Sequence, residues 1–583
     1  MASDEPQADL ASSAIQAELD ERAASEAADQ VSPELTARVQ AAIELLEELG
    51  GDLTRLARIE EATRLRLVKA AGPLARPDRY SRKALSKVLA RQRLRQVREA
   101  DQAILDQTGI RSLRKDPVFR TPLPKPAQAL DAPVRDDGEP DDGGWAAAEA
   151  ARGDEEGAAL GAPVDVAGAD GADPEASAAG PRVARPRLCY VCKTDFHEVH
   201  FFYDQMCPSC AELNWTKRNA TADLRGRVVM VTGARVKIGY QAAIKVLRAG
   251  AECVVATRFP VDAARRFGAE PDAAQWRDRL HIYGIDLRHT PSVEALCEHL
   301  CATLPRLDGL INNACQTVRR PAGWYDHVVR GEDVAASALP ALERSFLERN
   351  AALVAGVAKA LGAGDDPAGA PLAVAERIRQ VGLWRSAVLS QVPLLAEDLE
   401  HGAASFPAGR LDADLQQVDQ RSFNSWRMTL AEVPTAELLE VHLVNAVAPF
   451  VLNARLKPLL ARAGTRDAHI VNVSAMEGQF YRRWKTDKHP HTNMAKAALN
   501  MMTRTSAADY LRDGIHMNSV DTGWVTDEDP LMLAKRKVAV HAFHPPLDIV
   551  DGAARIVDPL FDGIATGRHV WGVFLKDYRP APW

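Results

Sequence analysis

The spacing of apolar residues changes along the chain. Before residue 110 they recur every three or four positions, which is the period of an amphipathic helix. From residue 228 onward, short apolar runs such as Val228–Val231 alternate with longer stretches of helical period. Such runs are typical of strands that a parallel sheet buries on both faces. Their alternation with helices predicts an α/β domain with a doubly wound parallel sheet over residues 222–583.

The chain before this domain divides into segments of different composition. Residues 1–32 are rich in Ala, Ser, Asp and Glu, and we expect them to be disordered. Ser32-Pro33 is a helix start signal, and the helical period that follows predicts a region of about three helices over residues 33–114. Residues 115–187 contain too few apolar side chains to offset the entropy lost on folding, so we expect a flexible linker.

The first predicted strand of the α/β domain leads directly into a glycine-containing turn and a helix, VVMVTGARVKIGY, residues 228–240. The free N–H groups and the positive dipole end of a helix N-terminus favour a phosphate group. Gly233 and Gly239 match a dinucleotide-binding fingerprint, but Lys237 stands where that fingerprint has glycine. The turn therefore indicates either a nucleotide site on a Rossmann-type sheet or a plain strand-turn-helix connection.

Polar residues end the later predicted strands, where a parallel sheet binds its ligands. The second strand ends in Thr257-Arg258. An arginine there accommodates the extra phosphate of NADP, whereas an acidic residue would bind the ribose of NAD. Arg258, helped by Arg235, therefore favours NADP as the cofactor, with NAD as the alternative; a solvated loop arginine is the other interpretation of Arg258.

Several ordered motifs resemble the short-chain dehydrogenase/reductase family over residues 223–583. They are TGARVKIG, NNA, VHLVNAVAPF, IVNVSAMEG, TNMAKAALNMMT and NSVDTGWVTDE. The resemblance implies a nicotinamide cofactor bound by residues at the matching positions, namely Thr232, Gly233, Ile238, Gly239, Asp286, Asn313, Lys496 and Thr526. It also implies an active site that contains Asn445, Ser474 and Lys496.

The chain departs from the family four residues before Lys496. Thr492 stands where the family has the tyrosine that exchanges a proton with the substrate oxygen. A threonine hydroxyl is too weak an acid for this role near neutral pH. Tyr481, His491, or Thr492 acting with a water molecule are the alternative proton donors, and a purely structural role for Tyr481 fits its spacing equally well.

Two Cys-x-x-Cys pairs, Cys189/Cys192 and Cys207/Cys210, precede the α/β domain. This spacing predicts a structural, tetrahedral zinc site in a zinc ribbon over residues 188–216, with a hairpin through residues 199–203 between the two pairs. A redox-active dithiol and a pair of disulfides are the alternatives. Because the ribbon lies so close to the first strand, we expect it to brace the α/β domain rather than to bind nucleic acid.

Residues 317–432 interrupt the family resemblance after the fourth predicted strand. Without them, the rest of residues 222–583 has the length of one α/β domain. Apolar residues at helical spacing predict a largely helical insertion. Its position at the ligand-binding edge of the sheet predicts a lid or a wall of the substrate pocket, and an appendage that forms an oligomer is the alternative.

Composition narrows the range of functions and partners. The 583 residues carry a net charge of −7, and no run of about 18 apolar residues or N-terminal leader is evident, so we expect a cytoplasmic protein with no membrane span. Nucleic acid is not favoured as a partner, since the basic face of residues 79–98 is more simply solvated. A protein partner at the helical region or the ribbon, and a homo-oligomer, are further expectations.

Two functions are compatible with these patterns. The first is an NAD(P)-dependent oxidoreductase that acts on the carbonyl or alcohol group of a small molecule. The second is a pseudoenzyme that binds NADP and serves as a scaffold or redox sensor, which the replacement of the family tyrosine by Thr492 favours. Retention of Asn445, Ser474 and Lys496 favours the enzyme.

Overall fold

The computed structural model describes residues 33–114, 180–360, 383, 386–400, 405–412, 416–481, 485–526, 528–541 and 544–583. The predicted disordered segment 1–32 and almost all of the predicted linker lie outside these residues.

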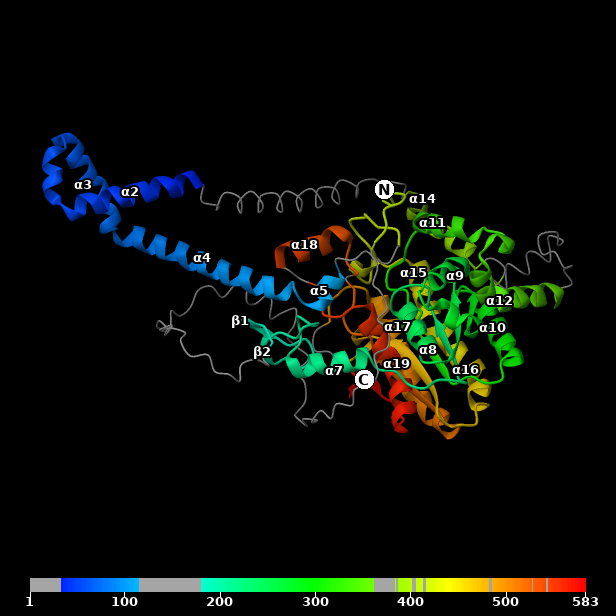
Figure 1. The fold of residues 1–583 in the computed structure, drawn as a ribbon. Coiled ribbons are helices and arrows are strands. Elements are labelled where there is room, and N and C mark those ends of the chain that lie inside the picture. The colour runs from blue at the N-terminus through cyan, green and yellow to red at the C-terminus, as the bar shows by residue number, and fades with distance from the viewer. Residues whose placement is uncertain are drawn as a thin grey trace.

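An eight-stranded sheet forms the centre of the α/β domain (Figure 1). Its strand order is β10-β9-β8-β7-β6-β3-β4-β5, and every pairing is parallel except that of β9 with β10. The strands are β3 (Val228–Thr232), β4 (Glu252–Thr257), β5 (Leu280–Gly284), β6 (Gly309–Asn312), β7 (Ala468–Ser474), β8 (Ile515–Asp521), β9 (Phe574–Lys576) and β10 (Arg579–Ala581). The predicted Rossmann-type fold is confirmed. Strand order reverses between β3 and β6, and such a switch point opens a crevice for a ligand.

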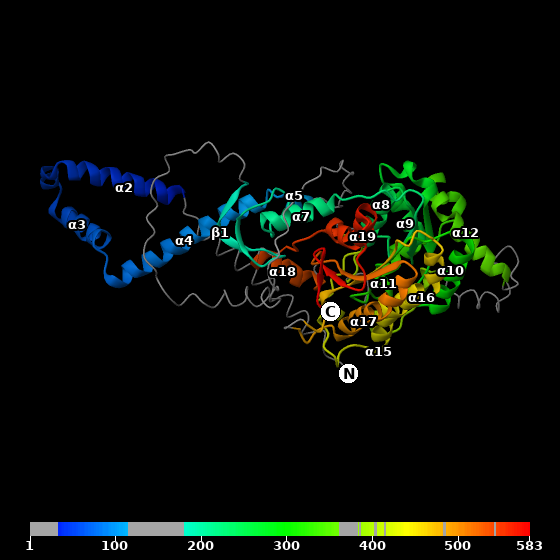
Figure 2. The same ribbon diagram turned by 90° about the horizontal axis from the view of Figure 1, so that it is seen from below.

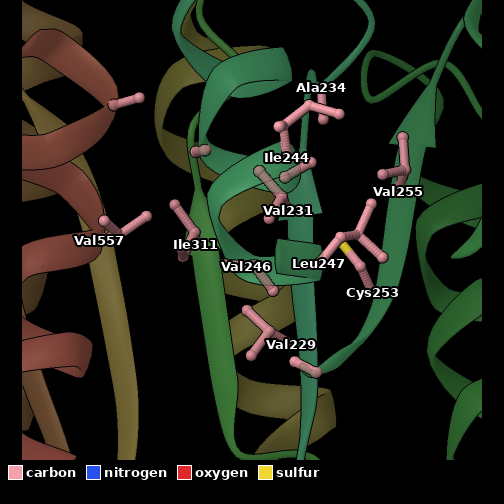
Figure 3. Packing of buried hydrophobic residues seen from close by; sticks show 14 of the residues in the cluster. Val229, Val231, Ala234, Ile244, Val246, Leu247, Cys253, Val255, Ile311 and Val557 are labelled. Carbon is pink, nitrogen blue, oxygen red and sulfur yellow. The ribbon is translucent and has the colours of Figure 1, made fainter. Parts of the chain in front are cut away.

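Helices cover both faces of the sheet. One face carries α8 (Lys237–Arg248), α9 (Pro260–Gly268), α12 (Ala341–Ala360) and α19 (Ile549–Thr566), and the other carries α10 (Thr290–Thr303), α16 (Ala448–Ala461) and α17 (Pro490–Arg512). Val229 and Val231 pack towards α8, beside Ile244 and Leu247 (Figure 3). Val228 and Met230 belong to the core on the opposite face. Burial on both faces explains the uninterrupted apolar runs in the sequence.

The predicted N-terminal helical region is present and extends away from the α/β domain (Figures 1 and 2). It consists of α2 (Pro33–Gly51), η1 (Leu53–Arg58), α3 (Glu61–Ala75), α4 (Arg79–Leu105) and α5 (Gly109–Leu113). The apolar positions that predicted the first helix, Leu35, Val39, Ile43 and Leu46, are 42–50% exposed. Within this helical region, buried side chains begin at the end of α4, where Leu105 packs against β1 and the segment after β2, and Ile110 packs against the cysteine module.

The cysteine module is formed by β1 (Arg182–Leu188), β2 (Asp195–Glu198) and α7 (Pro208–Arg218). The predicted hairpin through residues 199–203 is wrong, because the antiparallel hairpin is formed by β1 and β2 and carries the first cysteine pair at its turn. The predicted end of the linker at residue 187 is also wrong, since β1 lies within it. Of the seven β1 side chains only Val183 is buried, so the strand has almost no apolar pattern to detect.

Among the described residues of the insertion, long helices occur only before residue 361. The insertion contains α11 (Ala322–Glu332), η5 (Ala336–Ala338) and α12, whose Phe346 stacks on Trp276 at 5.9 Å. From residue 386 onward its described residues hold only short helices, η6 (Val388–Gln391), α14 (Glu397–Glu400) and η7 (Ser425–Arg427). The prediction of a largely helical insertion is therefore wrong for this second part. Side-chain to backbone hydrogen bonds, such as that from Trp324 Nε1 to the Gln417 carbonyl, hold it instead.

One helical segment, Thr435–Ala461, is long and apolar enough to cross a membrane by length and composition. It runs through α15 (Thr435–His442), a π-helical turn η8 (Leu443–Val447) and α16. Leu452, Leu456 and Leu459 of this segment are fully buried, and α16 packs chiefly against α10. These contacts are those of a core helix.

A buried ion cluster joins the cysteine module to the α/β domain. Arg218 of α7 forms a bidentate pair with Asp548, at 2.6 and 2.8 Å, and its Nη1 lies 2.9 Å from Asp551. Tyr203 donates its hydroxyl proton to Asp551. These two aspartates also form the capping box at the start of α19. All three charged residues are at most 2% exposed, so none of them has water as an alternative partner.

We expect Arg218→Met to lower the free energy of unfolding by about 3–5 kcal/mol, because it leaves two buried carboxylates without their cation. Urea unfolding followed by tryptophan fluorescence measures this change. Arg225→Met is the matched control, since Arg225 pairs with Asp223 on the surface and is 81% exposed; it should leave the unfolding midpoint unchanged. Equal stability of the two variants would contradict the role assigned to the cluster.

Candidate functional site

A cavity of about 1180 Å³ lies at the carboxyl ends of the parallel strands. Three parts of the chain line it: the α/β domain, the insertion through residues such as Trp324, Gln416 and Trp426, and the cysteine module through Tyr190 and Lys193. Described residues of the insertion therefore form part of the wall of this cavity. The predicted site residues that line the cavity are Gly233, Arg235, Ile238, Gly239, Arg258, Asp286, Asn313, Ser474, Lys496 and Thr526.

The turn between β3 and α8 has the backbone that a phosphate-binding turn requires. Gly233 has a φ of +67°, and a Cβ atom there would lie 2.8 Å from the Ala314 Cα atom. A Cβ atom on Gly239 would lie 2.3 Å from Asn313 Nδ2. Lys237 adopts a φ of +57°, the left-handed conformation that glycine adopts without strain. Lys237 therefore adopts the backbone conformation of a glycine in this turn, at a conformational cost.

Thr232 holds the turn in place but does not line the cavity. Its hydroxyl oxygen accepts hydrogen bonds from the backbone N–H groups of Asn313, at 3.1 Å, and Ala314, at 3.0 Å. Asn313 Nδ2 in turn donates to the carbonyl groups of Thr232 and Gly233. Thr232, which the family resemblance predicted to bind the cofactor, is thus a positioning residue that joins β3 to β6.

The ends of β4 and β5 bring Arg258, Arg235 and Asp286 to the cavity. Arg258 donates to the hydroxyl groups of Ser390 and Tyr325 of the insertion, at 3.1 and 3.0 Å. Within the described part of the chain, no carboxylate pairs with it. Arg235 is instead neutralised by Asp262 at 2.6 Å.

Asp286 is buried and paired with Arg288. Although burial opposes it, hydrogen bonds from Arg288 hold the pKa of Asp286 below its usual value. Arg288 also contacts Glu440 at 2.6 Å. Asp286 is therefore a fixed carboxylate at the rim of the cavity.

Ser474, Asp521 and Lys496 meet at the ends of β7 and β8. Ser474 and Asp521 are register partners on these parallel strands, so they end side by side. Ser474 is 3% exposed, and among the described residues no group forms a hydrogen bond with its hydroxyl. Lys496 Nζ donates to the Val473 carbonyl at 2.7 Å, which leaves two of its three protons for a ligand.

Asp521 was not among the residues singled out from the sequence. Burial, followed by repulsion from Glu477 and Asp577, raises the pKa of Asp521 to about 7. A carboxyl group with such a pKa is an effective general acid near neutral pH. The motif NSVDTGWVTDE contains Asp521, but only the register with Ser474 reveals its position in the site.

Asn445 lies in the π-helical turn η8, next to the cavity rather than on its surface. Its Oδ1 accepts from the Gln316 backbone N–H at 2.8 Å, and its Nδ2 donates to the Gln316 carbonyl at 3.0 Å. π-helical turns interrupt helices preferentially at functional sites. Asn445 thereby fixes the point at which the chain leaves β6 for the insertion.

The three proton donors considered from the sequence do not line the cavity. Thr492 and His491 are buried in the first turn of α17, and His491 Nε2 lies 3.6 Å from Glu437. Tyr481 is 51% exposed. The structure therefore does not bring Tyr481, His491 or Thr492 together with Ser474 and Lys496 on the surface of the cavity.

The four cysteines of the cysteine module converge. Their Sγ atoms all lie within 4.8 Å of one another, with 3.6 Å between those of Cys192 and Cys207. The backbone N–H of Cys207 donates to the Cys189 Sγ atom at 3.3 Å. Next to the first pair, the Tyr190 hydroxyl accepts from the backbone N–H of Trp524 at 2.9 Å, which places the cysteine module against the segment that follows β8.

We expect Lys237→Gly to raise the free energy of unfolding by roughly 0.5–1 kcal/mol. The left-handed conformation costs a non-glycine residue about 1–2 kcal/mol, and the added freedom of glycine in the unfolded chain offsets part of that gain. Thermal unfolding measures the change. The matched control is Lys245→Gly in the middle of α8, which should destabilise the domain; stabilisation by both or by neither would show that Lys237 is unstrained.

Comparison with known proteins identifies the α/β domain. Residues 227–328 match the family model described as short chain dehydrogenase. Residues 418–540 match the model described as enoyl-(acyl carrier protein) reductase, a member of the same group. The gap between the two matches corresponds to most of the insertion.

Similar proteins cover parts of the chain. An uncharacterized protein of Acanthamoeba polyphaga mimivirus is 27% identical over 387 residues, which are 64% of this chain and 71% of that protein. Retinol dehydrogenase 14 of Mus musculus is 36% identical over 102 residues, 16% of this chain and 30% of its own length. The NADPH-bound carbonyl reductase from chicken fatty liver superposes with a TM-score of 0.36 at 17% identity, covering 62% of this chain and 100% of its own. Two parts of the α/β domain thus match family models of the short-chain dehydrogenase/reductase type, one before and one after most of the insertion.

Proposed function

We propose that the α/β domain is an NADPH-dependent oxidoreductase that interconverts a carbonyl and an alcohol group on a small molecule. This proposal rests on the environment of the Ser474 hydroxyl. Ser474 is buried and lines the cavity, and its hydroxyl has no hydrogen-bond partner among the described residues. Unsatisfied buried hydroxyls are costly unless a ligand uses them. The oxygen of a carbonyl substrate is a suitable partner for it.

The residues around the cavity fit a nicotinamide dinucleotide. Gly233, Gly239 and the N-terminus of α8 present backbone N–H groups to a pyrophosphate. Arg258 has no carboxylate partner in the described part of the chain and faces the cavity beside Tyr325, which suits it to bind the 2′-phosphate of NADP(H). Arg235 is less suited, because Asp262 already neutralises it. Lys496 has two protons left for the hydroxyl groups of a ribose.

In this proposal, Asp521 replaces the missing tyrosine as the proton donor. When bound, the nicotinamide supplies a hydride to the carbonyl carbon in the direction of reduction. The Ser474 hydroxyl donates a hydrogen bond to the carbonyl oxygen and stabilises the charge that develops on it. The neutral carboxyl group of Asp521 transfers its proton to that oxygen and is left as a carboxylate, which solvent then reprotonates. Its position next to Ser474 in the register supports this role.

A pseudoenzyme that binds NADPH is the competing function. Its support is that Thr492 cannot act as the family tyrosine does, and that the ribbon and helical region offer surfaces for a partner. The presence of an acid with a pKa near 7 at the site favours the enzyme. The match to retinol dehydrogenase 14 spans about a third of that protein and leaves the substrate open.

We expect Asp521→Asn to lower the rate of NADPH oxidation by a panel of aldehydes and ketones at least about 100-fold, the usual share of a general acid, without changing NADPH affinity. Because the protonated acid is required, the wild-type reduction rate should fall as the pH rises through about 7, and oxidation of the alcohol should show the opposite trend. Tyr481→Phe is the control and should keep wild-type turnover. Retention of activity by Asp521→Asn, or its loss in Tyr481→Phe, would reject Asp521 as the donor.

We also propose that Cys189, Cys192, Cys207 and Cys210 bind a structural zinc ion. Ligand sulfurs of tetrahedral zinc lie about 3.8 Å apart, given Zn–S distances of about 2.3 Å, and the spacing of the four sulfurs fits this arrangement. Four thiolates close the coordination sphere, so the ion would have no position for substrate. It would fix the hairpin turn that presents Tyr190 and Lys193 to the cavity.

We expect Cys207→Ser to remove one zinc ion per chain and to lower the melting temperature, because binding of the metal contributes to folding of the module. Metal analysis of the purified protein and thermal unfolding measure the two effects. Cys301→Ser is the control, since Cys301 is a partly buried cysteine that lies outside the cluster. Unchanged zinc content in Cys207→Ser would contradict the proposal.

A further inference from the structure

Three histidines converge at the end of the sheet opposite the cavity. His469 and His516 are the second residues of β7 and β8, and they are register partners on these parallel strands. His569 follows α19 and joins them from the segment that leads to β9. Five residues separate His469 from Ser474, which is about 17 Å along a strand. The cluster is therefore separate from the proposed oxidoreductase site, and the inference below does not rest on that function.

The ring nitrogens of the three histidines are close enough to share one ion. One nitrogen of each ring lies within 4.8 Å of the corresponding nitrogen of the other two. His469 Nε2 is 3.0 Å from His569 Nδ1. Nitrogen ligands of tetrahedral zinc are about 3.3 Å apart, given Zn–N distances of about 2.0–2.1 Å. Small side-chain movements therefore suffice to place an ion between the rings.

The backbone of α19 leaves room for this arrangement at Gly563. A Cβ atom on Gly563 would lie 2.6 Å from His569 Nδ1 and 2.8 Å from His469 Nε2, the same two nitrogens that approach each other. Contacts below 3.0 Å to rigid rings cannot be relieved without moving them. A glycine at this point of the helix is thus required for the three rings to meet.

Imidazole binds metal ions in its neutral form. Two arginines lie near the rings: Arg227 is paired with Asp467 at 2.8 Å and with Asp308 at 3.4 Å, and Arg466 donates to the Arg512 carbonyl at 3.0 Å. His516 Nδ1 lies 3.3 Å from the Ala468 carbonyl, a contact that orients the ring and leaves Nε2 for a ligand.

We propose that His469, His516 and His569 bind a divalent transition-metal ion, with zinc as the expected ion. Three neutral imidazoles form a borderline-soft donor set that suits zinc, copper and nickel rather than magnesium or calcium. His569 is only partly buried, so water can complete the coordination from that side. The ion would tie β7 and β8 to the segment after α19, and its effect would be on the stability of this edge of the sheet.

Zinc analysis of the full-length protein tests this site. The protein is saturated with zinc chloride, dialysed and analysed for bound metal and melting temperature. We expect two zinc ions per chain in the wild type, one in the four-cysteine site and one in the histidine site. His569→Ala and Gly563→Ala should each bind one fewer, and zinc should no longer raise their melting temperature as it does in the wild type.

Two controls separate this site from the four-cysteine site. His299→Ala replaces a half-buried histidine outside the cluster and should keep both ions. In cobalt-substituted protein, Cys207→Ser should lose the thiolate charge-transfer bands but keep the cobalt ion of the histidine site. His569→Ala should keep these bands and lose the cobalt ion of the histidine site. Wild-type metal content in a folded His569→Ala variant, or loss of all bound metal in Cys207→Ser, would overturn the proposal whether or not the protein is an oxidoreductase.

Discussion

The hydroxyl of Thr232 joins the carboxyl ends of β3 and β6, and the layout of the cavity depends on this junction. These strands flank the point where strand order reverses, where a parallel sheet opens a crevice for a ligand. The bonds from the backbone N–H groups of Asn313 and Ala314 to Thr232 hold the two ends together. The side-chain amide of Asn313, which donates to the Thr232 and Gly233 carbonyls, leaves so little space that only glycine fits at position 239. The start of α8, the site for a pyrophosphate, is thereby fixed against β6.

The cavity wall extends beyond the family domain because buried polar contacts attach two further parts of the chain to it. The ion cluster of Arg218, Asp548 and Asp551 fixes the cysteine module to α19, and the Tyr190 hydroxyl binds the backbone after β8. On the opposite side, Arg258 binds Tyr325 of the insertion. Such contacts are costly to break, since water cannot replace the lost partner. The cysteine module and the insertion are therefore structural parts of the cavity wall.

The sequence was informative where one short segment determines the structure. The apolar runs predicted the sheet, and the paired cysteines predicted a cluster whose four sulfurs meet. Features that depend on contacts between distant segments were missed. The carboxyl group of Asp521 reaches the site because β8 pairs with β7, which places Asp521 beside Ser474 although the two strands are far apart in the sequence. Strand β1 is held by its pairing with β2 rather than by buried side chains. Tyr481, chosen by proximity in sequence, lies outside the cavity lining.

Hydride transfer from the nicotinamide to a carbonyl carbon can be followed with an isotope label. Purified protein is incubated with NADPH that carries deuterium at C4 of the nicotinamide, in both stereochemical forms, and with a panel of aldehydes and ketones. Mass spectrometry of the products then shows where the label goes. We expect an alcohol with one deuterium on the former carbonyl carbon, and only from one of the two stereochemical forms of labelled NADPH. Tight NADPH binding with no labelled alcohol from any substrate of the panel would contradict it.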